Sequence, residues 1–232
     1  MALQKRYEGR SDIFVFKRFV EFEGPNRLDA ILASTPISPE FDVLSIDIDG
    51  NDYHIWDSLQ GYRPKVVVIE FNMAIPVEVD FVQPKDMSIM QGSSLAAMVR
   101  LGEQQGYRLI HVTITNAIFV DEKYYSRFGI ADGSPSALWT ERPFLTYFFQ
   151  LYDGTFRIAG CQELIWNRKY PIKTSRLQIL PRVLRVYPER YRRYPHGVRW
   201  RLFKMLDRFR DVWDRIRGDD SRDQGQCRVV SR

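Results

Sequence analysis

The stretch Asp42–Trp56, DVLSIDIDGNDYHIW, decides the fold class, because it joins a hydrophobic strand pattern to a helix through a run of carboxylates. The aliphatic residues of the strand pattern are Val43, Leu44, Ile46 and Ile48. A charge inside a core is costly unless it is paired or bound to metal. We therefore expect Asp47, Asp49 and Asp52 at the open end of a buried strand over residues 42–48.

Outward from this stretch, strand and helix patterns alternate along the chain. The pattern predicts helices over 2–9, 26–34 and 52–60, and a further helix that is capped by Ser93 or Ser94 and ends at Gly106. It predicts strands over 12–22, 42–48, 65–71, 107–113 and 117–121. The unbroken run KVVVIEF at 65–71 is typical of a strand covered on both faces, so we expect Trp56 and Val66–Ile69 to be buried. This alternation predicts an α/β fold with a mainly parallel sheet.

Length and composition favour one main domain with appendages. The chain has 232 residues, 44% of them hydrophobic, and it shows no signal peptide pattern and no aliphatic run long enough to cross a bilayer. Its two cysteines form no CxxC, and its three histidines have no metal-ligand spacing, which argues against a zinc site. A reducing compartment is favoured, so we expect a cytoplasmic protein, with peripheral membrane association left open.

Positive charge is concentrated near the carboxyl terminus. The net charge is +5, yet the segment Arg176–Arg217 holds twelve arginines and one lysine against four acidic residues. We predict a basic amphipathic helix over 197–217, with an apolar stripe of Leu202, Leu206, Phe209, Trp213 and Ile216. Three partners are open for it: an anionic membrane surface, protein, or nucleic acid. The two tryptophans in this segment argue against nucleic acid.

These patterns divide the chain into four parts. Residues 1–160 form the α/β domain, 161–196 an irregular capping segment, 197–217 the basic helical appendage and 218–232 a disordered tail. Within the domain, the long loop 72–91 is expected to serve as a lid or binding loop. Its polar residues Gln83, Lys85 and Gln91 are candidate contacts to a polar substrate.

Two motifs resemble the later half of FkbM-like S-adenosylmethionine-dependent methyltransferases. The family carries an IDxEGxE-like turn, a helix and a RPxxxxxE strand, and here these read SIDIDGNDYHIW and RPKVVVIEFN, within residues 10–125. The resemblance implies a Rossmann-like, methyltransferase-type domain, a contact from Asp47 to the cofactor, and O-methylation of a sugar or other hydroxylated metabolite.

The chain departs from that family at its amino end. It contains no GxGxxG turn, which in the family holds the cofactor, so the resemblance implies a domain truncated before the predicted strand 12–22. We expect weak or no binding of S-adenosylmethionine by this chain alone. The alternative function is a non-catalytic α/β binding or scaffold module derived from a methyltransferase.

The acidic strand ends admit three interpretations. Asp47, Asp49, Glu70 and Asn72 offer only hard oxygen ligands, suited to Mg²⁺ or Ca²⁺, and such an ion lowers the pKa of a bound hydroxyl. Alternatively, Gly50 makes a tight turn while Asp49 and Asp52 cap the next helix. The third interpretation is metal-free acid–base chemistry or substrate binding, with Asp49 and His54 as catalytic residues. Neighbouring carboxylates are expected to raise the pKa of His54.

Overall fold

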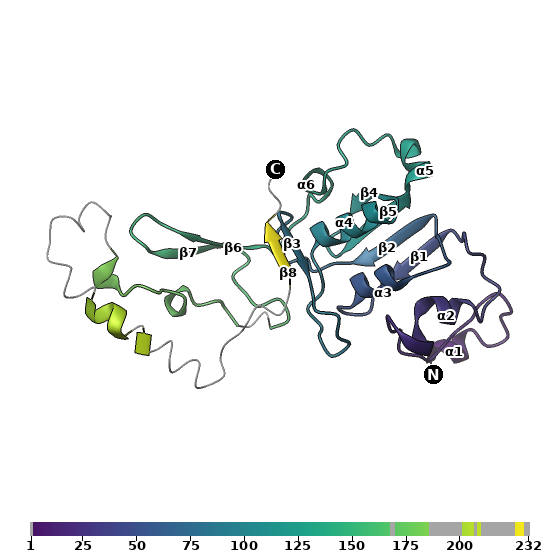
Figure 1. The fold of residues 1–232 in the computed structure, drawn as a ribbon, viewed down its shortest axis with the longest axis horizontal. Helices are drawn as coiled ribbons and strands as arrows, with labels where there is room; N and C mark the ends of the chain where they lie inside the picture. Colours follow the sequence, from purple (N-terminus) through teal and green to yellow (C-terminus); the bar gives the residue numbers. More distant parts are fainter. Residues whose placement is uncertain (1, 168–169, 186–200, 207, 210–225, 230–232) are drawn as a thin grey trace. The chain divides into compact units, whose positions relative to one another are not determined.

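The computed structural model describes residues 2–167, 170–185, 201–206, 208–209 and 226–229 (Figure 1). It divides the chain into two compact units, residues 1–142 with 225–232 and residues 143–224. The sequence pattern placed the end of the α/β domain at residue 160. Residues 143–160 instead belong to the second unit.

The first unit is built on a four-stranded sheet in the order β1-β2-β5-β4. Its strands are β1 (Val43–Ile46), β2 (Val66–Glu70), β4 (Tyr107–Val112) and β5 (Asn116–Asp121). β1 and β2 are parallel, whereas β5 is antiparallel to both β2 and β4. The α/β class is confirmed, but the sheet is mixed. Residues 113–115 are too short for a crossover helix, so β4 and β5 form a hairpin.

Short helices complete the first unit. They are α1 (Ala2–Arg6), η1 (Gly24–Asn26), α2 (Leu28–Leu32), α3 (Asp52–Ser58), α4 (Leu95–Gln104), α5 (Glu122–Tyr125), η2 (Ser126–Phe128) and α6 (Pro135–Leu138). The predicted cap of α4 is confirmed, because the Ser94 hydroxyl accepts the Ala97 backbone N–H.

The core lies between the sheet and helices α3 and α4 (Figure 1). Trp56 of α3 is 1% exposed, and its ring lies 5.0 Å from that of Phe119 on β5, centroid to centroid. Val67 and Ile69 are fully buried on the same face of the sheet. The prediction that β2 is covered on both faces is wrong: Val66 and Val68, whose side chains alternate to the other face, are only half-buried.

Residues 12–22 do not form the predicted strand. This segment holds only an isolated parallel bridge between Glu21 and Arg27, and Phe14 and Phe19 are exposed. An alternating pattern makes a strand only where its backbone groups pair with a neighbouring strand, and the described part of the sheet offers this segment no such pairing.

The predicted loop 72–91 contains a strand. β3 (Val79–Val82) pairs in antiparallel fashion with β8 (Gln226–Val229). The four residues of β8 fall in the range 218–232, for which the sequence predicted a disordered tail. Pairing with β3 satisfies backbone groups that a free tail leaves to water.

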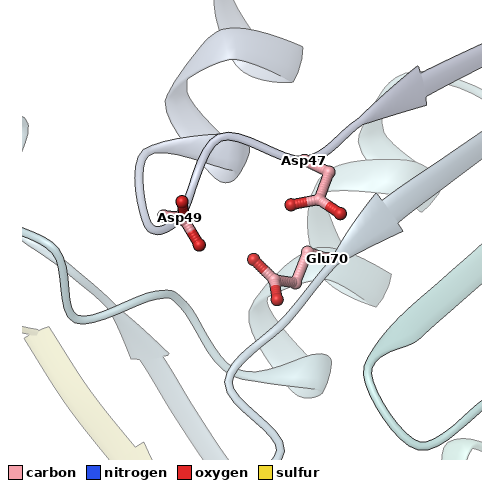
Figure 2. A group of neighbouring side chains, drawn as sticks. All are labelled: Asp47, Asp49 and Glu70. Carbon is pink, nitrogen blue, oxygen red and sulfur yellow. The ribbon is translucent and has the colours of Figure 1, made fainter.

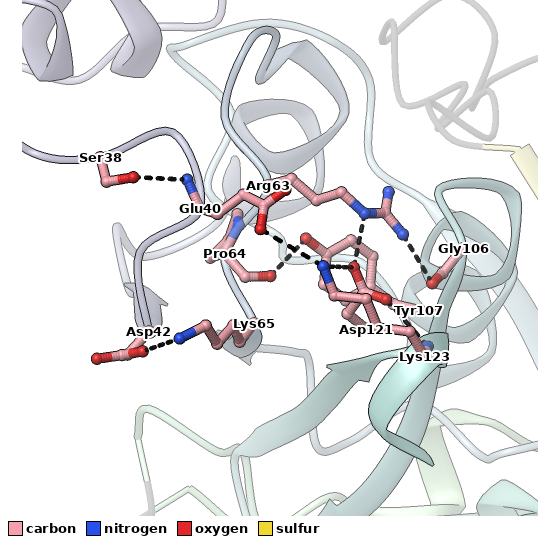
Figure 3. A network of polar contacts seen from close by, with 10 residues as sticks. All are labelled: Ser38, Glu40, Asp42, Arg63, Pro64, Lys65, Gly106, Tyr107, Asp121 and Lys123. Atoms are coloured by element: carbon pink, nitrogen blue, oxygen red, sulfur yellow. Dashed lines mark hydrogen bonds and ion pairs between the residues drawn. The ribbon is translucent and has the colours of Figure 1, made fainter. Parts of the chain in front are cut away.

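An ion-pair network ties the amino end of β2 to the end of α4 and of β5 (Figure 3). Arg63 Nε donates to the carboxylate of Asp121 at 2.6 Å, and the Asp121 side chain is only 3% exposed. The other guanidinium nitrogens donate to the carbonyls of Gln105 and Gly106 at 2.9 and 3.2 Å. Burial by itself raises the pKa of Asp121, but the hydrogen bonds from Arg63 and from the Lys123 backbone, with the charges of both residues, outweigh it and lower that pKa.

The second unit has a small core. It contains the antiparallel hairpin of β6 (Thr146–Gln150) and β7 (Phe156–Gly160), with η3 (Thr174–Arg176) and η4 (Arg182–Leu184). Leu145 and Leu184 are its buried apolar residues in the described chain. Residues 201–206 and 208–209 are helical, and the rest of the predicted basic helix 197–217 lies outside the described residues. Over the described residues, no helix has the length and apolarity to cross a membrane.

Candidate functional site

Three carboxylates meet where β1 and β2 end. The parallel register sets Ile46 beside Ile69, so the next residues, Asp47 and Glu70, emerge side by side at the carboxyl ends of the two strands. Asp49 reaches the same place from the turn that follows β1 (Figure 2). One oxygen of each carboxylate lies within 4.8 Å of an oxygen of the other two. We call Asp47, Asp49 and Glu70 the acidic triad.

The turn that carries Asp49 has an unusual backbone. Asp49 has a φ of 59° and Gly50 a φ of 141°. A Cβ atom on Gly50 would lie 2.9 Å from the Cα of Met90, so only glycine fits here without displacing the backbone of the facing loop. The expected role of Gly50 in a tight turn is confirmed.

Asp52 holds this turn from the inside. Its buried carboxylate accepts the backbone N–H groups of Ile48 and Gly50 at 3.0 and 2.9 Å. The cap position of α3 belongs to Asn51, whose side chain makes no capping hydrogen bond. The expectation that Asp49 and Asp52 cap the helix is therefore wrong. Asp52 satisfies the amides of the turn, and Asp49 makes no hydrogen bond or ion pair to any described residue.

The triad has the electrostatics of a cation or proton site. No ion pair or hydrogen bond joins its side chains to other groups among the residues that the structure describes. Burial, followed by the charges of Asp47, Asp52 and Asp49, raises the pKa of Glu70 to about 7. Near neutral pH the site can take up either a proton at Glu70 or a divalent cation, which offsets two of the three negative charges.

The triad oxygens are close enough to share one cation. Two oxygens bound to the same ion are separated by no more than twice the metal–oxygen distance, about 4.6–5.2 Å for Ca²⁺ and about 4.0–4.2 Å for Mg²⁺. One oxygen of each triad carboxylate lies within 4.8 Å of the others, which meets this requirement for Ca²⁺. This upper limit does not discriminate between Ca²⁺ and Mg²⁺.

A polar scaffold ties the loop 83–92 together beside the site. Gln83 is 1% exposed, and its amide nitrogen donates to the Ile89 carbonyl at 3.1 Å. Its amide oxygen accepts the backbone N–H groups of Gln91 and Gly92 at 3.0 and 2.8 Å. Gln83, considered a substrate contact from its sequence, is therefore a structural residue. A glutamine in a polar loop gives no sequence signal for such burial.

Asn51 and Asn72 attach the strand ends to that loop. The Asn51 amide donates to the carbonyls of Asp86 and Ile89 at 3.2 and 3.1 Å. The Asn72 amide nitrogen donates to the Gln91 carbonyl at 2.6 Å, and its oxygen accepts the Ala74 backbone N–H at 2.9 Å. Asn72 is a predicted metal ligand, but its side-chain nitrogen is engaged with the loop at Gln91 and its side-chain oxygen with the backbone of Ala74.

His54 has its ring in a different environment from the triad. Nε2 donates to the Gln83 carbonyl at 2.9 Å, and the ring packs edge-on against Phe22 and Tyr53. Burial lowers the pKa of His54, with a smaller lowering effect from Lys85. The expectation of a raised pKa is wrong, because desolvation outweighs the raising effects of the hydrogen bond to Gln83 and of the charge of Asp57. The bond to Gln83 fixes the tautomer of a largely neutral ring.

Comparison of the chain with protein-family models, with curated proteins and with solved structures finds no match.

Proposed function

We propose that the first unit is an FkbM-like methyltransferase-type domain of the Rossmann-like class, in which the acidic triad binds a divalent cation and a hydroxylated substrate such as a sugar. The observation that carries the proposal is the meeting of the two resembling motifs. Their acidic residues, Asp47 and Asp49 from the first and Glu70 from the second, converge at the carboxyl ends of adjacent parallel strands. Ligand sites of open α/β sheets lie at such ends.

The residues of the triad have distinct parts in this function. Asp47 and Asp49 are exposed and offer oxygens to a cation and to solvent. Glu70 is half-buried, and without a cation its pKa is about 7. A bound cation would lower that pKa and keep the carboxylate ionised as a ligand. A bound cation supplies Lewis-acid activation, which lowers the pKa of the hydroxyl. The chain's Asp52, Asn51 and Gln83 keep the turn and loop in place around these groups.

Cofactor binding distinguishes two candidate functions. The sequence has no GxGxxG turn, and no described glycine follows the carboxyl end of a strand in such a pattern. This observation favours the second candidate function, a binding module derived from a methyltransferase, which takes a cation or hydroxylated ligand without transferring a methyl group. The two candidates share the triad and differ in whether S-adenosylmethionine binds.

Cation binding is tested by thermal unfolding in the presence of Ca²⁺ or Mg²⁺. A ligand at one hundred times its dissociation constant stabilises the folded state by about 2.7 kcal/mol, so millimolar Ca²⁺ should raise the melting temperature of the wild type by several degrees. Glu70→Gln and Asp49→Asn should lose this rise. Glu103→Gln, an exposed carboxylate on α4 with the same change of charge, should keep it.

Two outcomes contradict the proposal. The first is an unchanged melting temperature of the wild type at about 10 mM Ca²⁺ or Mg²⁺. This concentration is far above the range in which intracellular sensor sites bind Ca²⁺, so the result would show that the triad binds no cation. An equal rise in wild type and both triad variants assigns any bound cation to another place. Isothermal titration with S-adenosylmethionine then separates the two candidate functions. Micromolar binding supports the methyltransferase, whereas weak or no binding, which we expect because the chain has no GxGxxG turn, favours the non-catalytic module.

A further inference from the structure

The second unit exposes an apolar helix face. Leu202, Leu206 and Phe209 are 50%, 63% and 67% exposed in the helical residues 201–206 and 208–209. Their spacing of four and three residues places them on one side of the helix. A contiguous row of large apolar side chains is seldom left exposed to water, so this helix face is a candidate binding surface.

Cations border that face on the same helix. Arg201, Lys204 and Arg208 line an open hollow of about 410 Å³ together with Met205 and Phe209. The hollow thus has cationic and apolar walls side by side. This combination fits a ligand that presents negative charge next to apolar surface, as the headgroup and acyl boundary of an anionic lipid bilayer does.

The β6–β7 hairpin of the same unit provides an independent second observation. Tyr147, Phe148 and Phe149 are consecutive residues of β6 and all are about half-exposed. Side chains alternate along a strand, so Tyr147 and Phe149 lie on one face and Phe148 on the other. The Phe148 ring stacks on Phe156 of β7 with centroids 4.8 Å apart, so the aromatic pair is held rigidly at the surface. Aromatic side chains of this kind are enriched where proteins meet the interface of a membrane.

The excess of basic residues in the second unit indicates a membrane with negative surface charge. Its described acidic residues are Asp153 and Glu163. Basic residues outnumber them and occur outside the helix as well, for example Arg157 on β7 and Arg182 on η4. Basic and apolar groups together argue for anionic lipid over nucleic acid, since phosphate contacts make no use of exposed leucine and phenylalanine.

We propose that the described part of the second unit, residues 143–167, 170–185, 201–206 and 208–209, binds the surface of an anionic phospholipid membrane. The helical residues 201–206 and 208–209 lie in the interface with Leu202, Leu206 and Phe209 toward the acyl chains and their cations at the headgroups. Tyr147 and Phe149, which share one face of β6, insert into the same interface. The interaction is peripheral. It is independent of the acidic triad and of the function proposed for the first unit.

Co-sedimentation of the full chain with vesicles tests this inference. Vesicles of phosphatidylcholine with about 30% phosphatidylserine should pellet the wild type, and pure phosphatidylcholine vesicles should pellet it far less. Each surface charge contributes about 1 kcal/mol, so Arg201→Gln and Lys204→Gln should each lower the affinity about fivefold. Lys17→Gln, an exposed lysine of the first unit, makes the same charge change and should leave the affinity unaltered.

The apolar part is tested by Leu206→Asp combined with Phe209→Asp, which should abolish pelleting at all salt concentrations. Phe149→Ser, on the hairpin, should weaken binding without changing its salt dependence. Circular dichroism of each variant establishes that the chain is folded. The wild type alone provides a further check, because its pelleting should be lost when added salt shortens the Debye length from about 10 Å to about 3 Å.

Three results overturn the inference. The first is equal pelleting with neutral and anionic vesicles, and the second is no pelleting with either. The third is tight binding of a single-stranded RNA oligonucleotide that survives the double aspartate variant, because this result assigns the basic surface to nucleic acid.

Discussion

Substitution of Glu70 by glutamine should make the protein more stable at pH 8 and leave its stability unchanged at pH 4. The structure places this side chain, half-buried, beside the carboxylates of Asp47, Asp49 and Asp52, and its pKa is raised from 4.5 to about 7. The folded protein thus holds a proton that the unfolded chain has released. The free energy of unfolding therefore falls as the pH rises from about 4.5 to about 7 and stays lower above that range.

The size of the effect follows from the change in proton affinity. A raise from 4.5 to about 7 corresponds to about 3 kcal/mol at about 1.4 kcal/mol for each tenfold change. Water screens part of this interaction because the side chain is only half-buried, so we expect about 1–2 kcal/mol. Glutamine resembles the protonated acid in shape and hydrogen bonding, and it does not titrate. The difference between Glu70→Gln and wild type should grow from zero at pH 4 to its full value at pH 8.

Urea unfolding followed by tryptophan fluorescence, in the presence of a chelator at each pH unit from 4 to 8, measures this difference. Glu103→Gln serves as the control and should run parallel to the wild type. The reasoning is refuted if Glu70→Gln is no more stable than the wild type at pH 8. Added Ca²⁺ should reverse the order at pH 8, since a cation stabilises the intact triad and not the variant.

Three further outcomes are expected. Arg63→Ala should lower the free energy of unfolding by about 1–3 kcal/mol, because it leaves the buried Asp121 carboxylate without its guanidinium partner. Lys65→Ala breaks an exposed ion pair. It should lower the free energy of unfolding by less than about 1 kcal/mol in the same urea titration. Gly50→Ala should lower the free energy of unfolding by more than about 1 kcal/mol, because the added Cβ would meet the backbone of Met90. The variant should also lose the rise in melting temperature with Ca²⁺. An unchanged rise would show that the turn tolerates a side chain. The chain alone should bind S-adenosylmethionine weakly or not at all in isothermal titration, and micromolar affinity would contradict this expectation.

Local pattern in the sequence was sufficient for most elements of the first unit. The aliphatic runs that became β1 and β2, the stop at Gly106 after α4 and the cap at Ser94 each depend on interactions within a few residues. The nearness of Asp47 to Glu70 was also predictable. It requires only that the two strands be parallel neighbours, which the helix between them makes natural.

Pairing and burial were decided by the tertiary structure. The strand pattern at 12–22 found no partner, and β5 inserted antiparallel between β2 and β4, since hydrogen bonding between strands depends on residues far apart in the chain. The sequence placed His54 near carboxylates but could not show that burial against Phe22 would lower its pKa.

The sequence by itself therefore determined an α/β domain with acidic groups at two strand ends. Only the tertiary structure separated the roles of those groups. Asp52 turned inward to hold backbone amides, whereas Asp47, Asp49 and Glu70 stayed together without partners in the described chain. The physical reason is that a carboxylate's role depends on which donors surround it in space, and the donors here come from the backbone of the turn and not from a pattern of side chains.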